Sequence, residues 1–286
     1  MRGGWLTNWL SSLSLTGLTL FVLITMLLAA FVGHAVHRWA RHRAKAGEQE
    51  DHNQEGYLVG SLLGFLALLM AFSFSMALDR YEERRHLVIQ EANAIGTAYL
   101  RTQLLDEPHR GRLSGLLVAY TDNRIALGTG SHAGLDRQLA INDRLLTEIW
   151  AAVTAARESA NVHGITTAVL ITFNEVIDLD TERKVARQVR VPAPVLLLLY
   201  WFLVMTAAVV GYVLDERRAR LGAFVLFVLL SMYVSIIADL NRPASGNIKE
   251  SQEPMLMLRQ SLKSQPPEAF DKFAAPRQAV VQSNAR

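Results

Sequence analysis

Four long segments without Asp, Glu, Lys or Arg constrain the fold of this chain most. They cover residues 15–36, 57–78, 193–214 and 221–238, and the only histidine among them is His34. A helix rises ~1.5 Å per residue, so each segment is long enough to cross a hydrocarbon core of ~30 Å. Buried helices of a soluble protein, the alternative, would need only about 10–14 apolar residues. The sequence therefore predicts four transmembrane helices.

Composition narrows the possible partners. The chain has no cysteine, which excludes disulfides, zinc-thiolate sites and thiol nucleophiles. Its net charge of +3 comes from arginines that flank the apolar segments, a pattern typical of contact with lipid headgroups rather than nucleic acid. Residues 1–35, with Arg2 before an apolar run, could also be a signal peptide. The run is long for one and no A-x-A site follows it, so we expect the first span to be retained.

The four spans divide the chain into two hairpins and a large insert. We expect an all-α integral membrane protein with a first transmembrane hairpin over 1–78, a helical extramembrane insert over 79–191, a second hairpin over 192–238 and a C-terminal tail over 239–286. The tail is expected to lack order after about residue 264. Pro192 and Pro194 suit the first turn of the third span, where a missing N–H costs little.

Apolar residues at helical spacing predict two buried faces in the insert. The segment 128–134, GTGSHAG, predicts the loop between the two helices. The first face is Leu113, Leu116, Leu117, Tyr120 and Leu127, and the second is Leu135, Leu139, Leu145, Leu146, Ile149, Trp150 and Val153.

The second span continues into the insert without a helix breaker. No proline or glycine occurs from Phe65 through Ile95, although the composition changes from apolar to charged after Leu78. This predicts one helix that leaves the bilayer and enters the insert. An even number of crossings puts the insert and both termini on one side, but arginines flank both ends of the spans in similar numbers and leave the side open.

Candidates for catalysis or metal binding are few. His34 and His37 stand three residues apart on one helix, but neighbouring arginines would oppose a bound cation. Glu82, Glu83 and Glu91 are expected to be solvated or paired with arginine rather than catalytic. We expect no catalytic residue, no metal, no cofactor and no enzyme activity. Ion-coupled transport is also disfavoured, since the spans carry no charged residue at membrane depth.

One row of residues on the second span has the spacing of a pore lining. In a ring of subunits such a row would form an apolar constriction that gates ions by dewetting, and within one chain it would be a helix-packing seam. Both interpretations remain open. The row is Gly64, Leu68, Phe72 and Met76.

Two stretches resemble a known family. The segment 63–96, LGFLALLMAFSFSMALDRYEERRHLVIQEANAIG, is similar to the bacterial bestrophin-like family, which has two helix pairs around a long helical insert. ADLNRPASG, residues 238–246, matches the family's second marker, with Ala244 in place of its usual aromatic residue. The resemblance covers about residues 15–250 and implies a family turn at Asp239, Arg242, Pro243 and Gly246.

The segment MALDRYEE is more distantly similar to the bestrophin channels, whose second helix carries the pore neck. This resemblance implies a homo-oligomer, a pentamer if truly bestrophin-like, that conducts inorganic ions across a bacterial plasma membrane with a cytoplasmic insert. The neck would lie at Gly64, Leu68 and Phe72. The alternative is a non-conducting scaffold or sensor whose insert binds a partner or ligand. The expected charges of the pore vestibule are Asp79, Arg80, Glu82, Glu83, Arg84 and Arg85.

Overall fold

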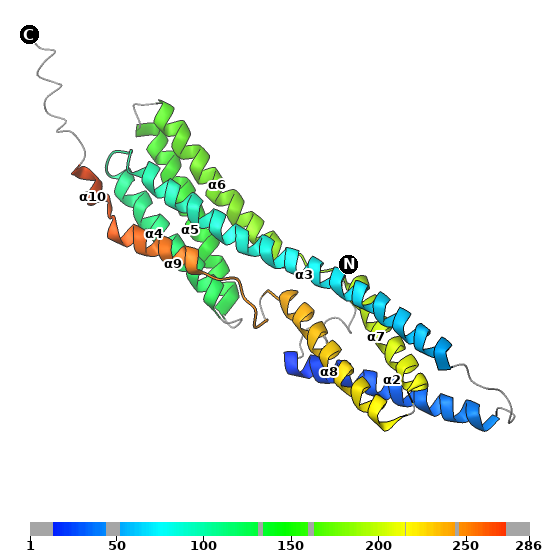
Figure 1. The fold of residues 1–286 in the computed structure, drawn as a ribbon. Helices are drawn as coiled ribbons and strands as arrows, with labels where there is room; N and C mark the ends of the chain where they lie inside the picture. The colour runs from blue at the N-terminus through cyan, green and yellow to red at the C-terminus, as the bar shows by residue number, and fades with distance from the viewer. Residues whose placement is uncertain are drawn as a thin grey trace, which may run out of the picture. The chain divides into compact units, whose positions relative to one another are not determined.

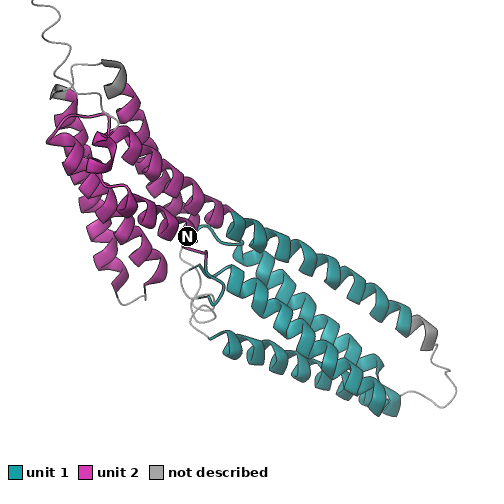
Figure 2. Ribbon diagram, turned by 60° about the vertical axis from the view of Figure 1, so that its left-hand side comes forward, with its two compact units in different colours: residues 1–82, 189–249 teal, residues 83–188, 250–286 magenta. Residues whose placement is uncertain are grey.

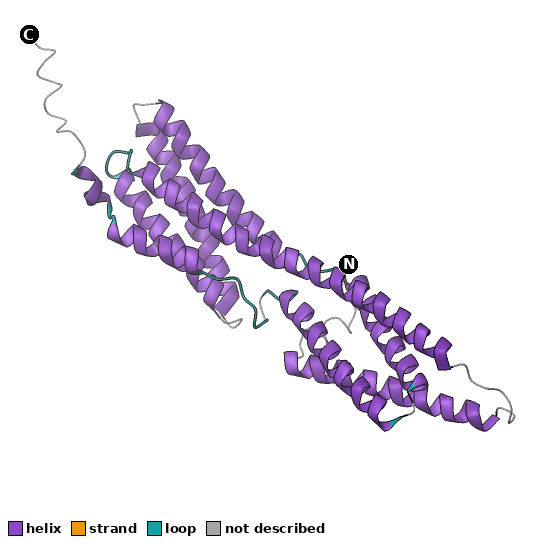
Figure 3. Ribbon diagram, viewed as in Figure 1, coloured by secondary structure: helices purple, strands orange, loops and turns teal. Residues whose placement is uncertain are grey.

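The computed structural model describes residues 14–43, 52–130, 134–159, 163–214, 216–243 and 246–272, without the side chains of 52–55, 158–159 and 163–166. The described residues form helices joined by short connections, with no strand among them (Figures 1 and 3). The predicted all-α fold is confirmed. The helices are α2 (Leu15–Arg43), α3 (His52–Thr102), α4 (His109–Thr129), α5 (Leu135–Ser159), α6 (His163–Gln188), α7 (Ala193–Val213), α8 (Arg217–Leu240), α9 (Glu253–Ser264) and α10 (Pro267–Asp271).

Four stretches of helix are long and apolar enough to cross a membrane. They lie within Leu15–Arg43, Gly56–Thr102, Thr167–Val213 and Arg217–Leu240. These match the four predicted spans, and the chain is a multi-pass membrane protein. Helix α3 runs unbroken for 51 residues, which confirms the continuous helix expected from the lack of breakers between Phe65 and Ile95. Pro192 caps α7 and Pro194 occupies its first turn, also as expected.

The chain forms two compact units, which Figure 2 shows in different colours. Unit 1 comprises residues 1–82 and 189–249, and unit 2 comprises 83–188 and 250–286. Unit 1 contains the transmembrane helices, and unit 2 contains the insert together with α9 and α10.

In unit 1, helix α2 packs against both α7 and α8. Gly33 of α2 lies so close to α7 that a Cβ there would overlap the carbonyl oxygen of Ala208. Gly211 of α7 makes the equivalent approach to Ala30 of α2. Without a hydrophobic driving force between helices in lipid, such glycines allow the close backbone contact that stabilises a helix pair. The hydroxyls of Thr19 and Ser235 join α2 to α8 through a 2.7 Å hydrogen bond.

The core of unit 2 confirms most of the predicted helical faces. Tyr120 of α4 and Ile149 of α5 are fully buried, and Phe173 of α6 packs into the same cluster. Trp150 is 43% exposed, so its prediction as a core residue was wrong. Because successive helical residues point about 100° apart, Ile149 and Val153 reach the core and Trp150 does not.

The C-terminal tail is part of unit 2 and is ordered further than expected. Met255 and Leu262 of α9 are buried in the unit 2 core, and α10 follows over Pro267–Asp271. The prediction that order ends near residue 264 was therefore wrong over this short helix. The tail is ordered here because α9 is amphipathic and its apolar side chains pack against unit 2. Residues 273–286 of the tail lie outside the described part of the chain.

Candidate functional site

The four pore-lining candidates share the exposed side of α3. Leu68, Phe72 and Met76 are 49%, 61% and 37% exposed, and a Cβ added at Gly64 would meet no atom within 4 Å. The row advances about 40° around the helix at each step of four residues, so it forms a broad face rather than a narrow line. The opposite side of this part of the helix is buried in unit 1 through Leu66, Met70, Ser73 and Ala77.

Aromatic contacts fix the orientation of α3 within unit 1. The ring of Phe65 lies 5.0 Å from that of Phe202 on α7, and the ring of Phe74 lies 5.7 Å from that of Tyr233 on α8. These contacts hold the side of α3 that carries Phe72 away from the unit 1 core. Among the residues that the structure describes, these positions therefore form an uncharged, exposed face of a membrane span.

The six vestibule candidates differ in their exposure to solvent. Arg84 is buried, and its Nε donates to Oε1 of Glu250 in an ion pair within unit 2. A guanidinium held in this way cannot supply charge to an open vestibule. The other five are exposed along α3: Asp79, Arg80, Glu82, Glu83 and Arg85.

Unit 2 contains a buried ion cluster that was not foreseen. Glu91 of α3 is fully buried and accepts hydrogen bonds from Arg124 Nη2 on α4, at 3.1 Å, and from Arg183 Nη1 on α6. Tyr120 donates its hydroxyl to Glu91 Oε1 at 2.8 Å. Arg124 also donates to Asp180 of α6 at 2.9 Å, which joins three helices through paired charges.

Local environment sets the protonation of the cluster. Burial alone would raise the pKa of Glu91, but the charges of Arg124 and Arg183 and the hydrogen bonds from Arg183 and Tyr120 outweigh burial and hold it below its ordinary value. Burial and the neighbouring Glu91 charge raise the pKa of Tyr120 well above its ordinary value. Glu91 is therefore ionised and Tyr120 protonated at neutral pH, which suits a hydrogen-bonded ion cluster better than proton transfer.

A signal for this cluster was present in the helical spacing. Arg124 follows Tyr120 by four residues and so continues the buried face of α4, and Asp180 follows Val176 in the same way on α6. Charged residues in phase with an apolar face have to be paired to be buried. Glu91 had been expected to be solvated or paired with arginine, and the structure shows the paired state.

The family turn is a tight structure at the end of α8. Asp239 accepts hydrogen bonds from the backbone N–H of Asn247 at 2.7 Å and of Ile248 at 3.1 Å. A Cβ at Gly246 would lie 2.6 Å from Asp239 Oδ1, so only glycine fits. Burial lowers the pKa of Arg242. The charge of Asp239 acts in the opposite direction, and the charge of Arg190 lowers the pKa further. Pro243 adjoins residues 244–245, which lie outside the described part of the chain.

The histidines near the first loop do not assemble into a metal site. His37 is buried in unit 1 with its ring 4.9 Å from that of Tyr212, edge to face, and His34 is only partly buried. Across the described residues, no group of three or more His, Cys, Asp or Glu side chains converges as metal ligands would. The described elements therefore offer an exposed face of α3, a buried ion cluster and a tight turn.

Comparison with known proteins gives one family and one fold. The family model described as "Bestrophin-like domain" matches residues 9–255. Comparison with curated proteins gave no match.

Among solved structures, the chain is similar to a bacterial bestrophin homologue from Klebsiella pneumoniae, with a TM-score of 0.61 and 16% identity over 90% of this chain and 99% of that one. Two point variants of that homologue give TM-scores of 0.62 and 0.63 at 16% and 15% identity, over 88% and 86% of this chain and 97% of each of theirs. At this identity the likeness shows the fold alone. The family match covers most of the sequence, and the chain belongs to the Bestrophin-like domain family.

Proposed function

We propose that the chain assembles into a homo-oligomer that forms an ion-conducting pore, with the exposed face of α3 lining its axis. The observation that carries this proposal is that Leu68, Phe72 and Met76, in a membrane span, are exposed in the described part of the chain. Rings of such side chains around an axis would form an apolar constriction that gates by dewetting.

Two further observations support the arrangement. The fold resembles that of bacterial bestrophin homologues over nearly their whole length, and bestrophins are the channel family that the sequence resembles. The helix that would line the pore continues from His52 to Thr102 into the helical insert. A change in the insert would then be passed to the constriction through one continuous helix. By the same resemblance, the proposal includes a bacterial plasma membrane and a cytoplasmic insert.

Replacing Phe72 with alanine is expected to raise single-channel conductance about fivefold, because lowering the dewetting barrier by about 1 kcal/mol changes a rate by that factor. Bilayer recording of the purified protein measures this. The matched control is Phe224→Ala, which truncates an exposed phenylalanine on α8 and is expected to leave the conductance unchanged.

The mass of the protein in detergent, measured by light scattering, provides the independent test. A monomer, or a conductance that is indifferent to Phe72→Ala, would contradict the proposed pore. A stable oligomer without conductance would favour the alternative of a non-conducting scaffold or sensor.

A further inference from the structure

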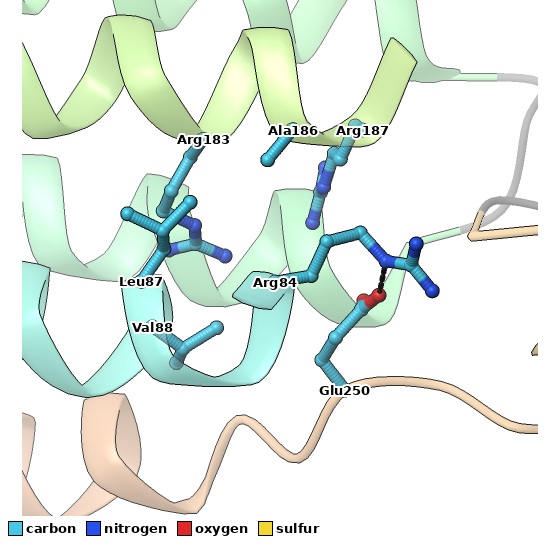
Figure 4. Close-up of a pocket in the computed structure, with 7 residues that line it drawn as sticks. All are labelled: Arg84, Leu87, Val88, Arg183, Ala186, Arg187 and Glu250. Carbon is cyan, nitrogen blue, oxygen red and sulfur yellow. Dashed lines mark hydrogen bonds and ion pairs between the residues drawn. The ribbon is translucent and has the colours of Figure 1, made fainter. Parts of the chain in front are cut away.

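Unit 2 contains a small pocket between α3, α6 and the segment that precedes α9 (Figure 4). The enclosed part of the space measures about 10 Å³, roughly one water molecule, and the space around it is open to solvent. Three guanidinium groups and one carboxylate line it, and the remaining wall is apolar. The lining residues are Arg84, Leu87, Val88, Arg183, Ala186, Arg187 and Glu250.

The carboxylates near this pocket are already engaged by two of the arginines. Arg84 pairs with Glu250, as the dashed line in Figure 4 marks. Arg183 pairs with Glu91, which also accepts a hydrogen bond from Arg124. All of these side chains are at least nine-tenths buried, so their charges are poorly screened by water.

Within the described part of the chain, Arg187 is the pocket arginine that has no ion-pair partner. It lies four residues after Arg183 on α6, hence on the same side of the helix, and its guanidinium points into the pocket in Figure 4. No hydrogen bond or ion pair joins it to another residue in the part of the chain that the structure describes. Burial lowers the pKa of Arg187 to about 10, and the charges of Arg183 and Arg124 add to this. The charges of Glu250 and Glu91 act in the opposite direction. A partly buried cation between like charges is stabilised by any anion that reaches it.

We propose that this pocket binds a phosphate-type oxyanion, either free or as a lipid headgroup, with Arg187 as its principal ligand. The guanidinium fork matches the oxygens of such an anion in two parallel hydrogen bonds. Arg84 and Arg183 line the same space, each paired with a carboxylate, and Leu87, Val88 and Ala186 lower the local polarity. The site is open to solvent, so an anion would be only partly enclosed there. The inference does not depend on whether the oligomer conducts.

Titration calorimetry of the full-length protein in a neutral detergent tests the site. Inorganic phosphate is titrated at constant ionic strength, with chloride as the balancing anion. Arg187→Gln is expected to raise the dissociation constant about tenfold or more, which is the loss of one charge-assisted hydrogen-bonding group. The control Arg144→Gln removes an arginine that is 81% exposed on α5 and is expected to bind like the native protein.

A parallel titration with short-chain phosphatidic acid distinguishes the two sources of the anion. Loss of affinity in Arg187→Gln for phosphate indicates a free oxyanion, and loss for the lipid alone indicates a headgroup. Glu250→Gln provides a change in the opposite direction, since it releases Arg84 from its partner and is expected to tighten binding of the same ligand. Absence of binding to both ligands, or equal affinity of the native protein and Arg187→Gln, would overturn the proposal.

The unfolding temperature without added anion shows whether the Arg187→Gln protein still folds. Arg187→Gln removes a partly buried charge that no described residue pairs with, and it is expected to unfold at the same temperature as the native protein or higher. With phosphate present, only the native protein is expected to gain stability, because ligand bound to the folded state raises its unfolding temperature. A gain of equal size in both proteins would count against Arg187 as the ligand.

Discussion

Glu91→Gln is expected to lower the free energy of unfolding by about 3–5 kcal/mol, the largest effect of any single substitution that we propose. Glu91 is fully buried and is the shared partner of Arg124 and Arg183. Glutamine has nearly the same volume, so the change removes the negative charge while preserving the packing. Two guanidinium groups would then lie in the core of unit 2 without this carboxylate, and Asp180, the other described carboxylate of the cluster, also pairs with Lys184.

Denaturant unfolding followed by circular dichroism measures this loss. Glu148→Gln is the matched control, since Glu148 is 39% exposed and pairs with the exposed Arg144 on the same helix. Such surface pairs contribute about 0–1 kcal/mol. A loss in Glu91→Gln no larger than that of the control would show that the cluster does not stabilise unit 2.

The Glu91 carboxylate is also expected to make the stability of the folded protein depend on pH. The pKa of Glu91 is lower in the folded protein than its ordinary value of 4.5, so its contribution is fully present above that value and is lost as the pH falls toward the folded pKa. The unfolding temperature of the native protein is expected to fall below about pH 4.5. Glu91→Gln is expected to show a shallower fall, because it lacks this carboxylate. Parallel profiles for the two proteins would contradict this assignment.

Gly33→Leu is expected to destabilise unit 1 by at least about 3 kcal/mol, because overpacking against backbone cannot be relieved by a side-chain rotation. A Cβ at this position would already overlap the Ala208 carbonyl of α7. The substitution therefore has to push α2 and α7 apart and loses the contact between Gly211 and Ala30 on the same interface.

Unfolding in mixed micelles of neutral detergent and dodecyl sulfate provides the measurement. Gly222→Leu is the control, since Gly222 lies in α8 and a Cβ there would meet no atom within 4 Å. Both substitutions improve helix propensity by a similar amount, about 1 kcal/mol relative to glycine. The difference between them reports the helix contact alone, and equal stabilities would show that α2 and α7 do not approach as closely as described.

Helix positions could be predicted from the sequence because they depend on local patterns. The length of each uncharged segment predicted the spans, the absence of breakers from Phe65 to Ile95 predicted the continuous α3, and Pro192 marked the start of α7. These features act within a few residues of one another, through helix geometry and the cost of exposing the backbone to lipid. Spacing placed Leu68, Phe72 and Met76 on one side of the helix, but it could not separate an open face from a packing seam.

Tertiary structure decided which distant residues meet. Glu91 pairs with Arg183 across 92 positions of sequence, and Arg84 with Glu250 across 166. Nothing in the local pattern of either residue identifies its partner, so Arg84 was expected to be a vestibule charge and proved to be buried. By itself the sequence determined where helices form and which of them can cross a membrane, because both follow from local composition. Which charges are neutralised, and that Arg187 has no ion-pair partner among the described residues, depended on bringing helices together in a medium where an unpaired charge is costly.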